Sequence, residues 1–232
     1  MTKTIPEEDF EKYLRPTWFL DSDEPSVVEF ARQAVGNAKD DREKGVRLFY
    51  AVRDGIRYNP YDIDLTRRGL KASVILARRE GYCVAKAIVL AAAARAVAVP
   101  SRLGFADVRN HLTTERLRSL MNTDVFFYHG YTELFLNGRW VKATPTFNIS
   151  LCERFGVKPL EFDGLSDTLF HEFDSKGNRH MEYVNDRGAF ADLPYETIVE
   201  SFRTHYPGFF KEDGTMVTGN FEKEALEDHG KA

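Results

Sequence analysis

The chain up to Pro100 carries its apolar residues at helical spacing. They recur every three or four positions, and acidic residues or proline precede the first two runs, as is typical of helix starts. The run that begins at Cys83 is apolar on nearly all sides, so we expect it to form a buried central helix. The pattern predicts helices over residues 25–36, 41–52, 73–79 and 83–97.

Beyond Pro100 the spacing changes to the alternation that is typical of strands. Two long runs flank Asn137-Gly138, and this dipeptide is the strongest short signal for a hairpin turn. The pattern predicts strands over residues 102–108, 125–136, 139–147, 159–163 and 181–184, and helices over 113–120 and 195–205. Helices followed by antiparallel strands indicate an α+β fold.

The hairpin turn also predicts the register of its two strands. With a two-residue turn, Leu136 pairs with Arg139, and the other pairs follow from there. They are Phe135 with Trp140, Glu133 with Lys142, Tyr131 with Thr144, and His129 with Thr146. Because side chains alternate across a sheet, His129 and Thr144 then lie on one face as diagonal neighbours. A hydroxyl at that position can accept the second N–H of the imidazole and fix its tautomer.

The composition is that of one ordinary globular domain. Hydrophobic residues make up 43% of the 232 positions, which excludes a disordered chain. No internal repeat or low-complexity linker divides the sequence. We expect a single domain over residues 1–210, with its core at about 45–150 and a C-terminal elaboration at 151–210. The charged segment 211–232 is predicted to be a polar tail and is a candidate for disorder.

Charge and hydropathy argue against two classes of binding partner, nucleic acids and membranes. A net charge of −4 without a dense basic patch argues against a nucleic acid partner. The N-terminus lacks the apolar core of a signal peptide, and the longest apolar run, which starts at Ala87, is too short to cross a bilayer. The two cysteines, Cys83 and Cys152, do not form a disulfide framework. We therefore expect a cytoplasmic protein with no membrane partner.

Cys83 and His129 are the candidate chemical groups. Cys83 opens the central helix, whose unpaired N–H groups and dipole favour an anion, and the thiolate is the reactive form of cysteine. His129 lies in the first strand of the hairpin, where an imidazole can take a proton and return it to a leaving group. This pairing predicts an acyl-transfer site in which cysteine is the nucleophile.

Two separated motifs carry a family resemblance. The first is Gly81-Tyr82-Cys83, ahead of a helix that contains Arg95-Ala96 and is followed by Val99-Pro100-Ser101-Arg102; the second is the run of residues 129–141. Over about residues 45–150 they resemble the nucleophile segment and the histidine strand of the transglutaminase-like superfamily. The resemblance implies a papain-like core, in which the cysteine helix packs on an antiparallel sheet. Such proteins include crosslinkers, peptidases, amidases and inactive relatives.

One position departs from the pattern of that family. Its members usually carry an aspartate before a proline at the end of the hairpin, whereas this chain has Thr144 before Pro145. A threonine can orient His129 but has no charge to stabilise an imidazolium, although papain-like proteases use a neutral asparagine there. The alternative is that a carboxylate from elsewhere, such as Asp107 or Asp163, takes this place.

Other thiols and imidazoles have simpler interpretations. Cys152 is expected to be a structural thiol, and His111, the rival base, lies in a polar context that is typical of the surface. His171 and His180 flank a turn, but their spacing is not that of metal ligands. We therefore expect no metal and no organic cofactor.

The sequence thus predicts a transglutaminase-like cysteine enzyme that acts on an amide bond of a protein or peptide substrate. Water as acyl acceptor would make it a peptidase or amidase, and a lysine would make it a crosslinker. The alternative is a non-catalytic member of the fold that binds a protein or peptide, for which Thr144 is the best argument.

Overall fold

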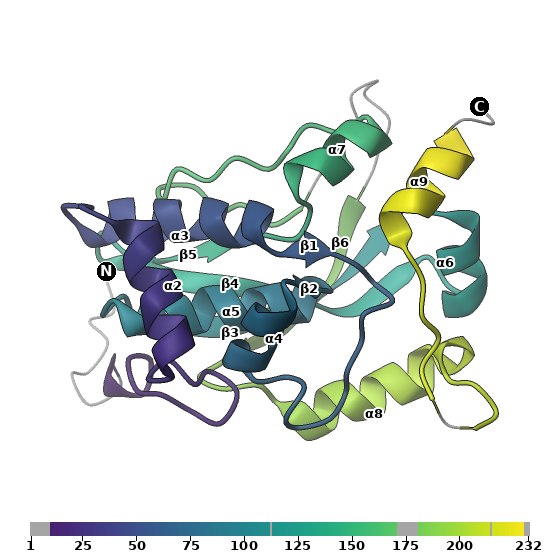
Figure 1. Ribbon diagram of the computed structural model, residues 1–232, viewed down its shortest axis with the longest axis horizontal. Coiled ribbons are helices and arrows are strands. Elements are labelled where there is room, and N and C mark those ends of the chain that lie inside the picture. The colour runs from purple at the N-terminus through teal and green to yellow at the C-terminus, as the bar shows by residue number, and fades with distance from the viewer. Residues whose placement is uncertain (1–9, 112, 171–180, 214, 230–232) are drawn as a thin grey trace.

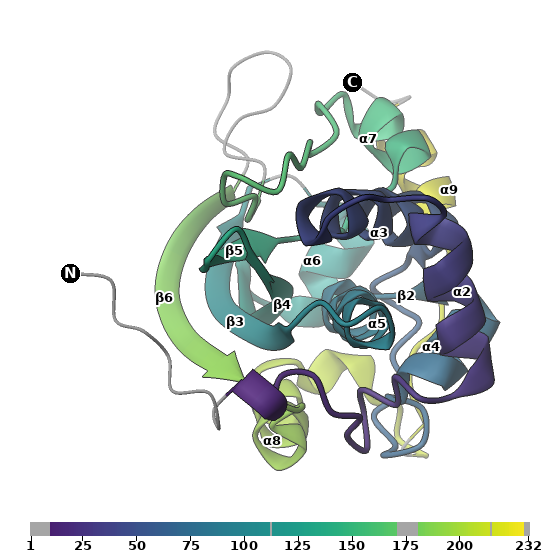
Figure 2. The ribbon, with the colours of Figure 1, turned by 90° about the vertical axis from the view of Figure 1, so that its left-hand side faces the viewer.

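One buried helix, α5 (Cys83–Ala96), runs through the centre of the molecule (Figure 1). The computed structural model describes residues 10–111, 113–170, 181–213 and 215–229. All residues of α5 from Cys83 to Arg95 are buried, which explains why the helix needs no polar face. Figure 2 looks almost along α5, with a curved sheet on one side of it and helices packed around its other side. These helices are α2 (Pro25–Val35), α3 (Asp41–Gly55) and α4 (Ala72–Arg78).

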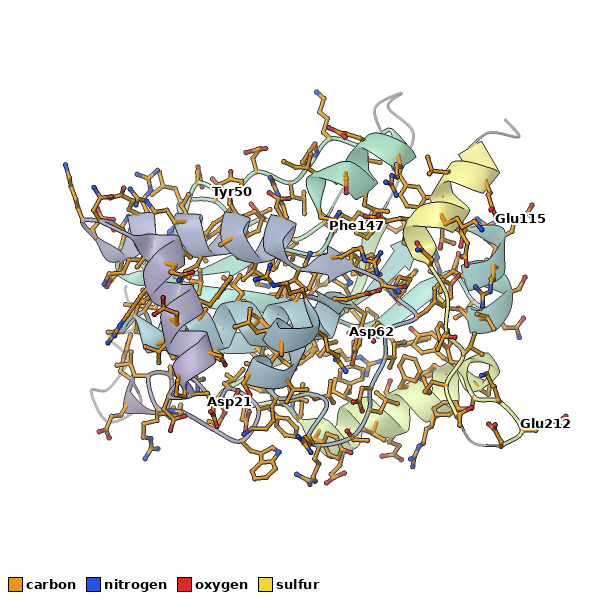
Figure 3. All side chains as sticks on the ribbon, viewed as in Figure 1. Asp21, Tyr50, Asp62, Glu115, Phe147 and Glu212 are labelled. Carbon is orange, nitrogen blue, oxygen red and sulfur yellow. The ribbon has the colours of Figure 1, made fainter. Side chains whose placement is uncertain are left out.

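The sheet is antiparallel throughout, with strand order β5-β4-β3-β6. Its strands are β3 (Ser101–Asn110), β4 (Val125–Leu136), β5 (Arg139–Ala143) and β6 (Met181–Phe190). A separate two-stranded parallel pair, β1 (Arg57–Tyr58) and β2 (Glu80–Gly81), leads into α5. Side chains fill the space between the helices and the sheet (Figure 3). The α+β class is therefore confirmed.

Most of the predicted elements are present. The four helices of the first half are confirmed, as are α6 (Glu115–Met121) and α8 (Tyr195–His205). The strand predicted over residues 159–163 is wrong, because that segment is irregular. Helix α7 (Ile149–Phe155) was not predicted, because it is short and its apolar residues show no clear helical spacing.

The hairpin register is confirmed near the turn and wrong farther from it. The pairs Leu136–Arg139 and Glu133–Lys142 form as predicted, but the ladder ends at Thr132–Ala143. The expected pairs of Thr144 and Thr146 do not form, because Pro145 has no N–H to donate and the Thr144 N–H donates instead to the Thr168 carbonyl, 2.9 Å away. The second strand therefore stops four residues earlier than predicted.

The segment after residue 211 is more ordered than its composition indicated. Helix α9 (Phe221–His229) buries Phe221 and Ala225, which lie on one helix face four positions apart. Glu224 on this helix accepts hydrogen bonds from Tyr61 (2.5 Å) and Arg116 (2.6 Å). The expectation of a disordered tail is corrected for these residues. Within the described ranges, no helix is long and apolar enough to span a membrane.

Candidate active site

The site is built where the start of α5 meets β4. Cys83 is the first residue of α5 and is 7% exposed. The backbone N–H groups of Gly130 and Val84 donate to its sulfur. A Cβ atom on Gly130 would lie 2.8 Å from the Val84 Cα atom, so only glycine allows β4 to come this close to the helix. The role of Gly130 was not predicted from the sequence, although a glycine inside a strand is a known signal of close backbone approach.

Burial raises the pKa of the Cys83 thiol to about 11, and the N–H groups of Gly130 and Val84 oppose that rise only in part. The net effect is opposite to what the helix start alone led us to expect. In this state the thiol keeps its proton at neutral pH, so it needs a base to become a nucleophile.

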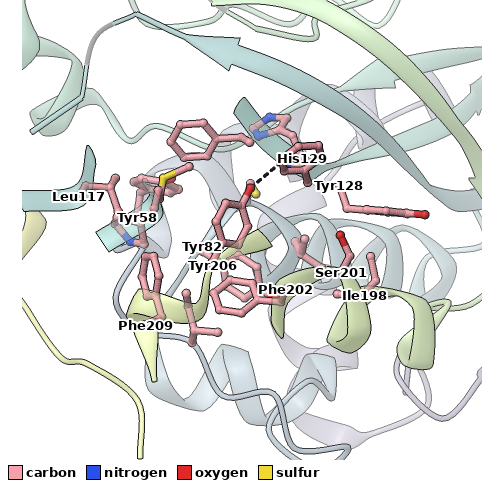
Figure 4. Close-up of a pocket in the computed structure, with 17 residues that line it drawn as sticks. Tyr58, Tyr82, Leu117, Tyr128, His129, Ile198, Ser201, Phe202, Tyr206 and Phe209 are labelled. Atoms are coloured by element: carbon pink, nitrogen blue, oxygen red, sulfur yellow. Dashed lines mark hydrogen bonds between the residues drawn. The ribbon is translucent and has the colours of Figure 1, made fainter. Parts of the chain in front are cut away.

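Cys83 and His129 line the same cavity (Figure 4). The cavity lies among α5, β4, α6, α8 and the short helix η1 (Pro207–Phe209). His129 is 6% exposed, so both predicted groups are shielded from bulk water. The structure thus brings together two residues that are 46 positions apart in the sequence.

A second, smaller cavity lies against His129, and Thr144 and Thr146 line it. Thr144 is 1% exposed, and among the described residues its hydroxyl has no hydrogen-bond partner. Thr144 and His129 therefore line one small cavity, but without the tautomer-fixing hydrogen bond that the predicted register implied.

Asp107 holds the strand segment next to His129. Its carboxylate accepts the Tyr128 N–H (3.1 Å) and forms an ion pair with Arg187 of β6, whose shortest N–O distance is 2.7 Å. A β-bulge lies here, because two residues of β4, Phe127 and Tyr128, stand opposite the single residue Asp107 of β3 between the Ala106 and Val108 pairings. Tyr128 in the bulge has φ 53°, an uncommon value for an aromatic residue, and Arg187 lies over its ring. Asp107 therefore supports the backbone that carries His129.

The bulge changes which side chains of β4 line the cavity. A regular strand presents alternate side chains to one side, yet the four consecutive residues 126–129 all line the cavity with Cys83. The extra residue changes the phase of the strand and so exposes a continuous stretch of β4 to the site.

Replacing Asp107 by asparagine is expected to lower the free energy of unfolding by about 1–3 kcal/mol, because a charged partner of Arg187 is lost. The rate at which Cys83 is alkylated should also fall, since the bulge that supports His129 loosens. Glu133→Gln is the matched control. Its carboxylate is equally buried and paired with Arg102 on the same sheet, but it lies beyond the bulge. Urea unfolding and iodoacetamide kinetics measure the two effects; equal alkylation rates in both variants would contradict this role of Asp107.

The other candidates lie in different surroundings. The Asp163 carboxylate accepts the N–H groups of Leu165 and Ser166 in an exposed loop. His111 is exposed and contacts Glu182 at 3.3 Å. Cys152 is buried, and burial raises the pKa of its thiol to about 12, which is consistent with a structural role. Residues 171 and 180, the two remaining histidines of the sequence analysis, lie outside the described residues. The described part of the chain holds no cluster of three metal-ligating side chains.

The site has the arrangement of a papain-like cysteine fold. The cysteine lies at the start of a central helix, and the histidine lies on the antiparallel sheet that packs against this helix. The family model of the transglutaminase-like superfamily matches residues 28–145, just over half of the chain. The chain belongs to the transglutaminase-like superfamily. The family predicted from the two sequence motifs is therefore confirmed.

Two solved structures resemble the chain over part of their length. One is a "putative cysteine protease" from Cytophaga hutchinsonii, with 16% identity, a TM-score of 0.48, and coverage of 82% of this chain and 58% of that chain. The other is a "putative protease" from Parabacteroides distasonis, with 14% identity, a TM-score of 0.37, and coverage of 59% of this chain and 25% of that chain. The chain thus spans less than two thirds of either protein. No curated protein matches the sequence.

Proposed function

We propose that the chain is a cysteine enzyme that cleaves an amide bond of a protein or peptide by acyl transfer. The observation that carries the proposal is the shared cavity of Cys83 and His129, with the N–H of the residue after the histidine directed at the sulfur. A thiol and an imidazole that face one enclosed space are the minimum set for nucleophilic catalysis by cysteine.

In the first half-reaction, His129 takes the proton of the Cys83 thiol, and the sulfur attacks the carbonyl carbon. The backbone N–H of Cys83 lies at the helix start, where no intrahelical acceptor uses it, and it stabilises the developing oxyanion. The C–N bond then breaks, the amine leaves with the proton held by His129, and a thioester remains on Cys83.

In the second half-reaction, His129 takes a proton from water while the water oxygen attacks the thioester. The C–S bond breaks, the acid leaves, and the proton returns to the thiolate. A lysine amine in place of water would give a new amide. Cys83 is 7% exposed, and water reaches so buried a thiol more readily than the side chain of a second protein does, so hydrolysis is the favoured outcome. The chemistry requires no metal and no organic cofactor.

The test is the pH dependence of Cys83 alkylation by iodoacetamide, followed by peptide mass spectrometry with Cys152 as internal control. If His129 accepts the thiol proton, labelling should show an inflection well below the free-thiol value of about 8.5. In His129→Ala, the inflection should move up toward the value of about 11 that burial imposes. His111→Ala, which changes an exposed imidazole, should leave the profile unchanged.

A native inflection near 11, unaltered in His129→Ala, would instead favour a non-catalytic protein of this fold that binds a protein or peptide. Two observations support this second candidate: the raised pKa of the Cys83 thiol, and the uncharged Thr144 beside His129. In that case Cys83→Ala should retain full binding of the partner.

Thr144→Asp is expected to increase amide turnover by about tenfold, because a carboxylate beside His129 stabilises the imidazolium that forms during the reaction. The matched control is Thr146→Asp, which adds the same charge at another residue that lines the small cavity. Turnover is followed with a chromogenic amide, and folding is checked by circular dichroism. A folded Thr144→Asp protein with lower turnover than the wild type would show that the site works with a neutral residue at this position.

A further inference from the structure

The cavity at Cys83 is lined by apolar and aromatic side chains. Among the described residues that line it there is no lysine, arginine, aspartate or glutamate, and His129 is the one imidazole. The aromatic part of the lining includes Tyr58, Tyr82, Phe126, Phe127, Phe202 and Phe209 (Figure 4). Away from His129, a charged group that entered this space would lose its water without gaining an ionic partner.

Two helices form the wall opposite β4. Helix α6 contributes Leu117 and Met121, and α8 contributes Ile198 and Phe202, each pair four positions apart and therefore on one helix face. Helix α8 lies outside residues 28–145, the part that matches the superfamily. This part of the wall is thus supplied by the C-terminal portion of the chain.

A hydrogen-bonded tyrosine fixes that wall to the sheet. The Tyr206 hydroxyl, at the end of α8, donates to the Val125 carbonyl (3.1 Å) and accepts the Phe127 N–H (2.5 Å). Burial raises the pKa of Tyr206, so the hydroxyl keeps the proton that it donates. Because both partners belong to β4, the wall and the strand that carries His129 are held in one arrangement. The cavity is therefore pre-formed.

We propose that this cavity receives the acyl side chain of the substrate, and that this side chain is uncharged and apolar, either aromatic or branched aliphatic. The inference rests on the proposed function, because the acyl group that becomes attached to Cys83 is the part of the substrate that must lie beside the sulfur. A carboxylate or ammonium group at that position is rejected by desolvation, and an apolar group gains the contacts that the aromatic lining offers.

Equilibrium binding to Cys83→Ser tests the proposal independently of the reactivity of the thiol. The probes are phenylacetamide, isovaleramide and the carboxylate succinamate, titrated by ligand-observed NMR. We expect both uncharged amides to bind at least about tenfold more tightly than succinamate, since desolvating an unpaired carboxylate costs more than that factor. Equal affinities, tighter binding of succinamate, or no binding of any probe would each overturn the proposal.

A substituted wall residue gives the second arm. Ser201 lines the cavity from α8 and is partly exposed, so the longer side chain of Ser201→Arg can be accommodated at the rim. In the Cys83→Ser background, this change should strengthen succinamate binding by about tenfold, the effect of one charge-assisted contact. The neighbouring exposed Glu200→Arg is the matched control and should leave the order of affinities unchanged. If both variants strengthen succinamate binding equally, the anion binds to the surface and the proposed pocket assignment is wrong.

The two arms separate this inference from the proposed function. Selective binding of apolar amides without low-pH alkylation of Cys83 would support the pocket and overturn the enzyme. Alkylation controlled by His129 without selective binding would support the enzyme and overturn the pocket assignment.

Discussion

Replacing Lys86 by methionine is expected to lower the free energy of unfolding by about 2–5 kcal/mol at pH 9, because two buried carbonyl groups lose their donor. Lys86 lies in the first turn of α5 and is fully buried. Its Nζ donates to the carbonyls of Arg53 (2.8 Å) and Ile56 (2.6 Å), which close the C-terminal end of α3. This single side chain therefore fastens α3 to the central helix.

The same variant should reveal a dependence on pH. Burial lowers the pKa of Lys86 from 10.5 to about 7, so between those values the unfolded chain holds a proton that the folded protein does not. The contribution of Lys86 to the free energy of unfolding therefore rises with pH, by up to about 1.4 kcal/mol per pH unit. The advantage of the wild type over Lys86→Met should be smallest below pH 7 and should grow from pH 7 to pH 9.

Guanidinium unfolding of both proteins at pH 6, 7, 8 and 9 measures this difference. Lys44→Met is the matched control, because the Lys44 ammonium also meets a helix-end carbonyl, that of Val97, but its side chain is partly exposed. That control is expected to lose less than about 1 kcal/mol. A difference between the wild type and Lys86→Met that is the same at every pH would show that Lys86 stays charged in the folded protein.

Gly130→Ala is expected to destabilise the protein by about 1–3 kcal/mol, because the added methyl group overpacks the contact between β4 and α5. Its Cβ would lie 2.8 Å from the Val84 Cα atom and 3.2 Å from the Val84 nitrogen. Both are backbone atoms, so the strand and the helix must move apart. The Gly130 N–H would then move away from the Cys83 sulfur, and the pKa of the thiol would rise further.

We expect Gly130→Ala to affect the rate of the proposed reaction more strongly than it affects the stability of the protein. A displacement of about 1 Å between reacting groups can cost about 100-fold in rate, and here the histidine strand itself is displaced. Amide turnover and thermal unfolding are measured on the same preparation. Gly55→Ala serves as control, because no atom lies within 4 Å of its added Cβ. A Gly130→Ala protein with wild-type turnover would mean that this close approach is not needed for activity.

The sequence indicated most of the helices and the candidate residues for the chemistry. Local signals were sufficient there: the acidic residues before α3, the all-apolar run of α5, and the Asn137-Gly138 turn each act over a few positions. The hairpin register was correct as far as the turn controls it. It failed at Thr144, where a distant segment, at Thr168, pairs with the strand instead.

The residues of the candidate site fall into the same two groups: those that local signals in the sequence indicate and those that depend on distant segments. Cys83 and His129 could be named from two motifs and Thr144 from its place before Pro145, because spacing and order are properties of the chain. Residues that support them could not be named. Asp107 on β3 forms an ion pair with Arg187 on β6, and Tyr206 at the end of α8 forms a hydrogen bond with β4. Neither contact can be recognised from neighbouring residues in the sequence.

The amino-acid sequence by itself therefore determined the class of the fold, its central helix and the pair of residues at the proposed site, since these depend on periodicity and on residue type. Only the tertiary structure showed how deeply that site is buried. The helix start alone favours a thiolate at Cys83, but enclosure by β4, α6 and α8 raises its pKa to about 11. Desolvation depends on every element packed around the sulfur, and those elements come from all parts of the chain.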